Sequence, residues 1–214
     1  MDPARIAELL RPFLACDGAA RLSLTSQQLE QISTYIDLLL RWNARMNLTA
    51  VRQPEEIVTR HFGESLFAAQ HLFPSRDVEG RFIDIGSGAG FPGLPIKIWN
   101  AKLHTTLIES NHKKATFLRE VIRTLTLTNI DVFAGRAEDF PGSADLVILR
   151  AVERFEAILP TAAGLVVSGG RLAVLIGEGQ VKAAHEKLPE LRWLALAPIP
   201  QSTNRVLLVG ERAL

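Results

Sequence analysis

Residues 82–99, FIDIGSGAGFPGLPIKIW, constrain the fold more than any other stretch of the chain. A strand-like apolar run ends at Ile85, glycines follow at positions 86, 88, 90 and 93, and a helical apolar pattern then begins. Four glycines are more than a tight turn needs, and they let the backbone pass close to a ligand at a helix N-terminus. The stretch predicts the first strand, turn and helix of a sheet that binds its ligand at the carboxyl ends of its strands.

From Arg81 onward, strand-like runs alternate with helical patterns. The runs cover residues 81–86, 104–110, 129–135, 144–151, 170–177, 192–199 and 204–211. This alternation predicts βαβ units with right-handed crossovers. The last two runs are too close together for a crossover helix, so we expect an antiparallel hairpin at one edge of the sheet. The predicted fold class is α/β, a Rossmann-like, seven-stranded, mostly parallel sheet with a C-terminal hairpin.

Residues 1–75 have helical periodicity instead. Thr25 and Gln28 have the spacing of a capping box at the start of a long amphipathic helix, and Pro54 suits the first turn of a third helix. The polar segment 73–80 is the predicted seam. We therefore expect an N-terminal helical subdomain over residues 1–75 and a ligand-binding domain over residues 76–214.

Composition narrows the function. The 214 residues carry a net charge of +1, with 47% hydrophobic and 22% charged residues, as in a soluble globular protein. No leader pattern and no membrane-length apolar run is present, so we expect a cytoplasmic protein without a membrane partner. A single cysteine, Cys16, excludes an intramolecular disulfide, and the scattered histidines predict no metal site.

The glycine-rich turn fits two ligands. Residues 88–93, GAGFPG, match the dinucleotide pattern GxGxxG, with Glu109 at a suitable distance beyond. Counted from the strand end, however, the glycines are Gly86 and Gly88, and Phe91 stands where the third glycine should pack. In that frame Asp84 lies two residues before a GxGxG, which resembles motif I of class I S-adenosylmethionine-dependent methyltransferases.

Polar residues follow the other predicted strands. Glu109 follows the second strand and suits two ribose hydroxyls, Ala137 and Glu138 follow the third, and Arg150 ends the fourth. Basic residues also gather at these strand ends, where a patch would hold RNA phosphates: Lys113, Lys114, Arg136, Arg150 and Arg154, with Arg60 and His61 from the helical part. We assign no catalytic residue and leave that role unknown. Cys16 belongs to the helical part, far from these strand ends, so we do not expect it to act as a nucleophile.

A set of motifs resembles the RsmG family, also called GidB. They are NLTAV (47–51), RH (60–61), RFIDIGSGAGFPGLPIKI (81–98), LIES (107–110), KKATFLREV (113–121), GRAEDFP (135–141) and LRAV (149–152). The resemblance implies methylation of guanine N7 in 16S rRNA with S-adenosylmethionine as cofactor. One departure is Ile176, where family members commonly carry lysine.

The resemblance and the strand-end argument together give the expected site. The cofactor-binding residues are Gly86, Gly88, Phe91, Glu109, Ala137, Glu138 and Arg150, and the substrate candidates are Arg60, His61 and Arg154. The expected partner is 16S rRNA in the small ribosomal subunit or its assembly intermediate, and we expect a monomer. The residues alone leave open a methyltransferase with another substrate, a dinucleotide-dependent oxidoreductase, and a non-catalytic ribosome-binding module.

Overall fold

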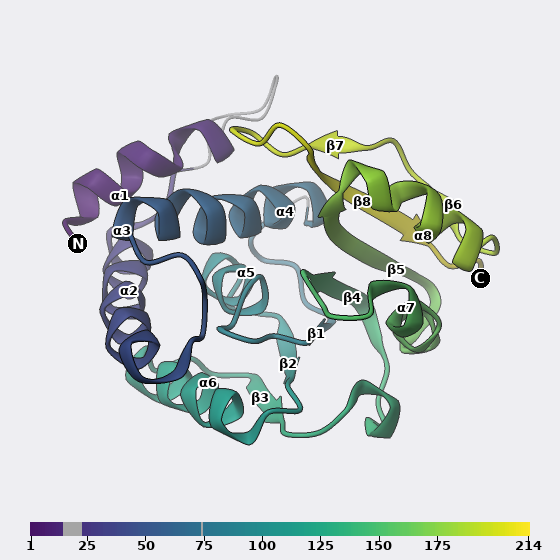
Figure 1. The fold of residues 1–214 in the computed structure, drawn as a ribbon, viewed down its shortest axis with the longest axis horizontal. Helices are drawn as coiled ribbons and strands as arrows, with labels where there is room; N and C mark the ends of the chain where they lie inside the picture. The colour runs from purple at the N-terminus through teal and green to yellow at the C-terminus, as the bar shows by residue number, and fades with distance from the viewer. Residues whose placement is uncertain (15–22, 74) are drawn as a thin grey trace.

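The computed structural model describes residues 1–14, 23–73 and 75–214. Cys16, which the sequence excludes as a nucleophile, lies outside the described residues. One sheet runs through the molecule in the order β3-β2-β1-β4-β5-β8-β6, with β7 also paired to β8 (Figure 1). The strands are β1 (Arg81–Ile85), β2 (His104–Ile108), β3 (Ile130–Phe133), β4 (Ala144–Arg150), β5 (Val166–Gly177), β6 (Arg192–Trp193), β7 (Ala197–Pro198) and β8 (Arg205–Glu211).

The predicted α/β fold class is confirmed, with one correction at the C-terminal hairpin. Strands β1 to β5 are parallel and β8 is antiparallel to β5, as the spacing of the last two runs predicts. The expected sixth strand over residues 192–199 is instead divided into β6 and β7, which both pair with β8. Residues 194–196 between them are exposed and belong to neither strand, so this arm is not one continuous strand.

The helices also follow the sequence pattern. They are α1 (Pro3–Leu10), α2 (Ser26–Met46), α3 (Pro54–Glu56), α4 (Glu64–Leu72), α5 (Gly93–Trp99), α6 (His112–Thr124), α7 (Phe155–Gly164) and α8 (Val181–Lys187). Short helical turns cover Arg11–Phe13, Ala137–Asp139 and Glu178–Gln180, and a π-helix, Ile57–Gly63, joins α3 to α4. The capping box is present: the Gln28 N–H donates to Thr25 Oγ1 at 3.2 Å, and the Thr25 N–H donates to Gln28 Oε1 at 3.0 Å.

Alternate strand residues contribute to two cores on opposite faces of the sheet. On β5, Ala173 and Leu175 belong to one core, while Leu172 and Val174 belong to the other. Helices α7 and α8 cover the second face, whereas α5, α6 and the N-terminal helices contribute to the first core. The division of the chain into two domains at residue 75 stays a prediction. Described residues on both sides of this position belong to the same first core.

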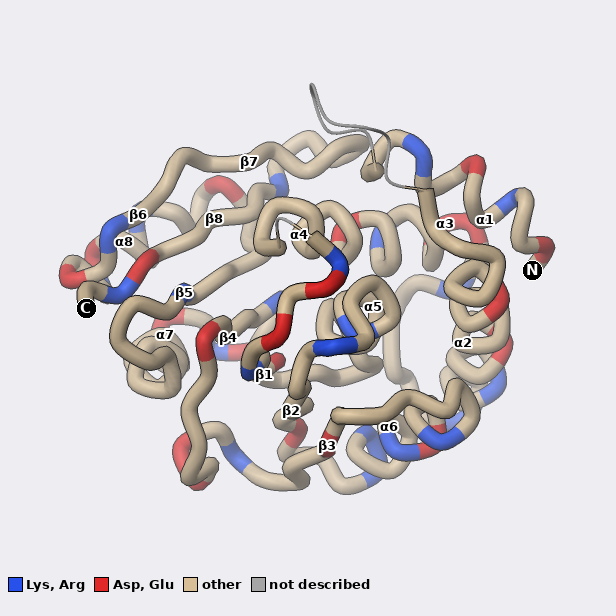
Figure 2. The backbone as a smooth tube through the Cα atoms, turned by 180° about the vertical axis from the view of Figure 1, so that it is seen from behind, with Lys and Arg blue, Asp and Glu red and all other residues tan. Residues whose placement is uncertain are grey.

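The charged residues are distributed over the whole chain. Figure 2 shows both signs on most elements, with Lys and Arg grouped along α6. Among the described residues, no helix has the length and apolar character that crossing a bilayer requires.

Candidate functional site

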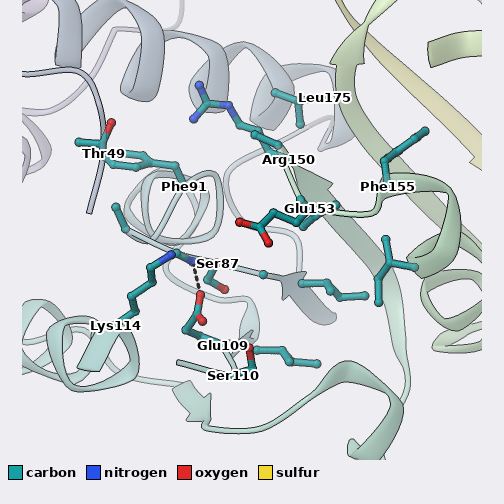
Figure 3. Close-up of a pocket in the computed structure, with 18 of the residues that line it drawn as sticks. Thr49, Ser87, Phe91, Glu109, Ser110, Lys114, Arg150, Glu153, Phe155 and Leu175 are labelled. Atoms are coloured by element: carbon teal, nitrogen blue, oxygen red, sulfur yellow. Dashed lines mark hydrogen bonds between the residues drawn. The ribbon is translucent and has the colours of Figure 1, made fainter. Parts of the chain in front are cut away.

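A pocket of about 800 Å³ opens where β1, β2, β4 and β5 end (Figure 3). One wall is formed by the glycine-rich turn and by the segments that follow β2 and β3, and the other by the NLTAV segment, the π-helix and the end of β4. All of the predicted site residues line it: Arg60, His61, Gly86, Gly88, Phe91, Glu109, Ala137, Glu138, Arg150 and Arg154. The topology therefore brings together residues that are up to 94 positions apart in the chain.

The glycine-rich turn has little space for side chains. Gly86 follows β1 with a φ of +68°, and a Cβ there would lie 2.6 Å from Val152 Cγ1. The Gly86 N–H donates to the carbonyl of Ile108 at 2.9 Å, which fixes the turn against β2. A residue with a side chain would be strained at this position and would also clash, so the glycine is required by both conformation and space.

Asp84, the acidic residue of motif I, lies beneath this turn and does not line the pocket. Its side chain is fully buried, and its Oδ2 accepts a hydrogen bond from the Gly93 N–H at 3.0 Å. Its Oδ1 has no hydrogen-bond partner among the described residues, and burial raises the pKa of this carboxyl to about 7. Asp84 thus joins the end of β1 to the start of α5 and shapes the turn from below.

Glu109 is held with its carboxylate at the pocket wall. Its Oε2 accepts the Gly88 N–H at 2.8 Å, drawn as a dashed line in Figure 3, and its Oε1 accepts the Asn111 N–H at 2.7 Å. Each carboxylate oxygen has a further lone pair, so Glu109 is still able to accept hydrogen bonds from two ligand hydroxyls. This arrangement suits the ribose role that the sequence predicts.

Phe91 is chiefly part of an aromatic stack. Its ring lies parallel to Tyr35 with centroids 5.3 Å apart, and His61 stacks on it at 4.6 Å. The Tyr35 hydroxyl donates to the Ala89 carbonyl in the glycine-rich turn. Helix α2 and the π-helix therefore hold the turn in place through Phe91.

Arg150 is paired within the chain. Its Nη2 lies 2.9 Å from Glu64 Oε2 and also donates to the Arg60 carbonyl at 2.7 Å. Glu64, 2% exposed, accepts a second arginine, Arg205, at 2.6 Å. The sequence predicts that Arg150 binds a phosphate. In the structure its guanidinium is instead paired with a buried carboxylate, and Arg150 forms part of the pocket wall.

His61 is hydrogen bonded through both ring nitrogens. Its Nδ1 lies 3.2 Å from Arg150 Nη1, and its Nε2 lies 2.8 Å from Thr49 Oγ1. Burial, reinforced by the positive charge of Arg150 and two further arginines, lowers the pKa of His61 to about 3. The ring is therefore neutral at physiological pH.

The remaining predicted residues lie at the pocket rim. Ala137 is buried in the short turn after β3, and the neighbouring Glu138 is exposed. Arg154 is exposed in a left-handed conformation with a φ of +55°, and Arg60 pairs with Glu56 at 3.0 Å on the surface. Arg60 and Arg154 are thus accessible to a large polyanion.

Thr49, Glu64 and Arg205 are among the pocket residues that the sequence did not single out. Glu64 had a detectable signal, because an acid within an apolar helical segment requires a cationic partner when it is buried. Arg205 had a topological signal, since the start of an antiparallel β8 lies beside Gly177 at the carboxyl end of β5. The hydrogen bonds of Thr49 had no signal in the sequence.

A model of the GidB family, described as rRNA small subunit methyltransferase G, matches residues 28–198. Two curated relatives are both named ribosomal RNA small subunit methyltransferase G. The Leuconostoc mesenteroides protein is 36% identical over 82% of this chain and 74% of its own length. The Xanthomonas campestris protein is 39% identical over 75% of this chain and 74% of its own.

The fold is also found among solved structures. Magnesium protoporphyrin IX methyltransferase from Synechocystis, solved with bound SAM, superposes with a TM-score of 0.65 over 86% of this chain and 97% of that one. Its sequence identity of 13% limits the likeness to the fold.

Proposed function

The chain belongs to the GidB family, rRNA small subunit methyltransferase G, and we propose that it transfers a methyl group from S-adenosylmethionine to N7 of a guanine in 16S rRNA. The observation that carries the proposal is the single pocket that gathers all of the predicted site residues at the carboxyl ends of the strands. The relatives' names support the substrate class, and the target atom rests on the resemblance described above.

The pocket walls fit the parts of this cofactor. Glu109 would accept hydrogen bonds from the two ribose hydroxyls, the bare backbone at Gly86 and Gly88 would adjoin the amino-acid tail, and Ala137 with Glu138 would flank the base. Phe91 and Arg150 would shape the site, since the ring is stacked and the guanidinium is paired. The bound cofactor supplies a methyl group that is activated by its sulfonium.

Methyl transfer to N7 requires mainly that the protein align the guanine with the methyl group of the cofactor. Guanine N7 has an in-plane lone pair and no proton to lose, so the attack needs no general base. His61, neutral and hydrogen bonded through both nitrogens, is consistent with that requirement. Arg60 and Arg154 at the rim would hold phosphates while the unpaired base enters the pocket.

Two measurements test the proposal. Calorimetric titration should give one S-adenosylmethionine bound per chain, and tighter binding of NAD would favour the oxidoreductase alternative. Ribosomal RNA from a strain that lacks this gene should then acquire one N7-methylguanine when incubated with protein and cofactor, mapped by chemical cleavage. Labelled methyl that appears in other acceptors but never in rRNA would overturn the assigned substrate.

Two glycine variants distinguish an effect on the pocket from a general effect of adding an aspartate to the protein. Gly86→Asp places a side chain where a Cβ already clashes, so it should abolish both cofactor binding and methylation. Gly179→Asp is the matched control, because a Cβ there meets nothing within 4 Å. A non-catalytic ribosome-binding module would retain its RNA binding in both variants and would methylate with neither.

The form of the substrate and the assembly state belong to the same proposal. Free 16S rRNA, an assembly intermediate and the mature subunit are to be compared as acceptors in the mapping assay. We expect a cytoplasmic protein that is a monomer. Size-exclusion chromatography with light scattering measures its molar mass and so checks the monomeric state.

A further inference from the structure

Thr49 lies in the pocket wall with nearly all of its hydrogen-bonding capacity in use. Its backbone N–H donates to Asn43 Oδ1 at 3.0 Å, and its carbonyl accepts from Asn43 Nδ2 at 2.9 Å. Asn43 is itself buried in α2, at 4% exposure. Asn43 therefore fixes the position of Thr49 through both of the peptide groups that flank it.

The hydrogen bonds of His61 determine which atom it presents to Thr49. Arg150 has no acceptor, so its Nη1 must donate to His61 Nδ1, and that nitrogen carries no proton. A neutral imidazole then carries its proton on Nε2, which donates to Thr49 Oγ1 at 2.8 Å. The relay therefore runs from Arg150 through His61 to the Thr49 hydroxyl.

A second donor uses the remaining acceptor capacity of that hydroxyl. The Val51 N–H donates to Thr49 Oγ1 at 3.1 Å. A hydroxyl has two lone pairs and one proton, and both lone pairs are now occupied. The hydroxyl proton has no acceptor among the described residues, so Thr49 acts toward the pocket as a donor only.

Thr49 also lies on the side of the pocket away from the proposed ribose contact. In Figure 3 it lies beside Phe91, across the pocket from Glu109 and Ser110. His61 stacks on Phe91 at 4.6 Å, so the relay cannot rotate away without breaking the aromatic stack. A donor of fixed position thus lines the pocket on the side that the proposed function leaves for the substrate base.

We propose that the Thr49 hydroxyl donates a hydrogen bond to O6 of the target guanine and thereby selects guanine over adenine. The inference rests on the proposed function. Guanine O6 is an acceptor beside N7, so this bond would orient N7 without occupying its lone pair. Adenine carries an amino group at the same place, and a hydroxyl whose lone pairs are filled has nothing to offer that donor.

The mapping assay with the wild-type enzyme first identifies the target position in the rRNA. Enzyme variants are then tested on RNA that carries base analogues at that position. Thr49→Val removes the hydroxyl, and Thr49→Ser keeps it. With guanine or inosine, which both carry O6, Thr49→Val should lose roughly 10-fold in kcat/KM, the equivalent of one hydrogen bond, while Thr49→Ser stays near wild type. With 2-aminopurine, which lacks O6, wild type should be slow and Thr49→Val should be no slower.

Several results would contradict the proposed contact with O6. If Thr49→Val loses as much on 2-aminopurine as on guanine, or weakens cofactor binding in calorimetry, the hydroxyl does not contact O6. His61→Phe keeps a ring on Phe91 but returns to the hydroxyl a lone pair that is able to accept from a 6-amino group, so the preference for guanine over 2,6-diaminopurine should shrink, and an unchanged preference would contradict the relay. Failure of the proposed function is distinct, because wild type would then methylate no rRNA.

Discussion

At the scale of single residues, neighbours set the ionisation of the pocket side chains. His61 is half-buried, stacks on Phe91 and has three arginines nearby, and its neutral ring serves as a hydrogen-bond relay. Asp84 is buried without a cation in contact and binds a proton far more tightly than a free carboxyl. Burial thus disfavours the charged form of both residues.

The tautomer of His61 is directly measurable. Because burial and the arginines lower its pKa to about 3, the ring should keep one proton on Nε2 from pH 5 to pH 8. Long-range proton–nitrogen NMR spectra of the imidazole should show this tautomer unchanged over that range. A titration of His61 midway through it would contradict the relay from Arg150.

Asp84 should make stability depend on pH. Its folded pKa of about 7 lies above the ordinary value of 3.8, so between these values the native state holds a proton that the unfolded state has lost. The free energy of unfolding therefore decreases as pH rises through this window. Asp84→Asn lacks this term and should gain up to roughly 4 kcal/mol relative to wild type between pH 4 and pH 8.

Denaturant unfolding of the Asp84→Asn variant and wild type at several pH values measures this difference. Asparagine retains an oxygen that is able to accept the Gly93 N–H, so the turn keeps its shape in the variant. A difference between variant and wild type that stays constant across the window would show that Asp84 does not titrate there.

At the scale of elements, one buried carboxylate connects three of them. Glu64 begins α4, and it pairs with Arg150 at the end of β4 and with Arg205 at the start of β8. The N-terminal helices are thus anchored by charge to the two strands that flank β5. This contact positions the π-helix, and with it His61, over the strand ends.

Removal of that carboxylate should be costly. Glu64→Gln leaves two arginines without their buried partner, so we expect a loss of about 3–5 kcal/mol in the free energy of unfolding. Glu56→Gln is the matched control on the same helical segment, because its pair with Arg60 is exposed and should contribute at most about 1 kcal/mol. Equal effects of the two variants in urea unfolding would refute the anchoring role.

At the scale of the whole molecule, the N-terminal helices complete one layer of the fold. Residues of α1, α2 and α4 belong to the same core as residues of β4, β5 and β8. Arg171 on β5 donates to the Leu72 carbonyl at 2.7 Å and adds a polar contact across this boundary. Without these helices, α5 and α6 alone would remain on this face of the sheet, and apolar side chains of the first core would be exposed to water.

The two parts of the chain should therefore fold together. A fragment of residues 76–214 is expected to lack cooperative unfolding and a dispersed amide NMR spectrum, because burial of its first core depends on residues before position 73. The full chain should unfold in one transition by circular dichroism. A well-dispersed spectrum from the fragment would show that it is an independent domain.

The sequence by itself determined the order of strands and helices, the parallel sheet, the glycine-rich turn and the rim on which Glu109 and Arg150 lie. These features depend on hydrophobic periodicity and on local backbone requirements, and both are determined by residues that are close together in the chain. It also placed His61 near the site through the RH motif, but it did not show what the ring contacts.

Only the tertiary structure decided how those side chains are used. The pairing of Arg150 with Glu64 and the burial of Asp84 arise from contacts between segments far apart in the chain, and the hydrogen bonds of the Thr49 hydroxyl depend on how His61 is held by Arg150, 89 positions away. Burial and long-range partners set ionisation and hydrogen-bond direction, and these depend on three-dimensional proximity that local sequence does not encode. The division of β6 from β7 likewise depends on how this arm meets β8 at the sheet edge.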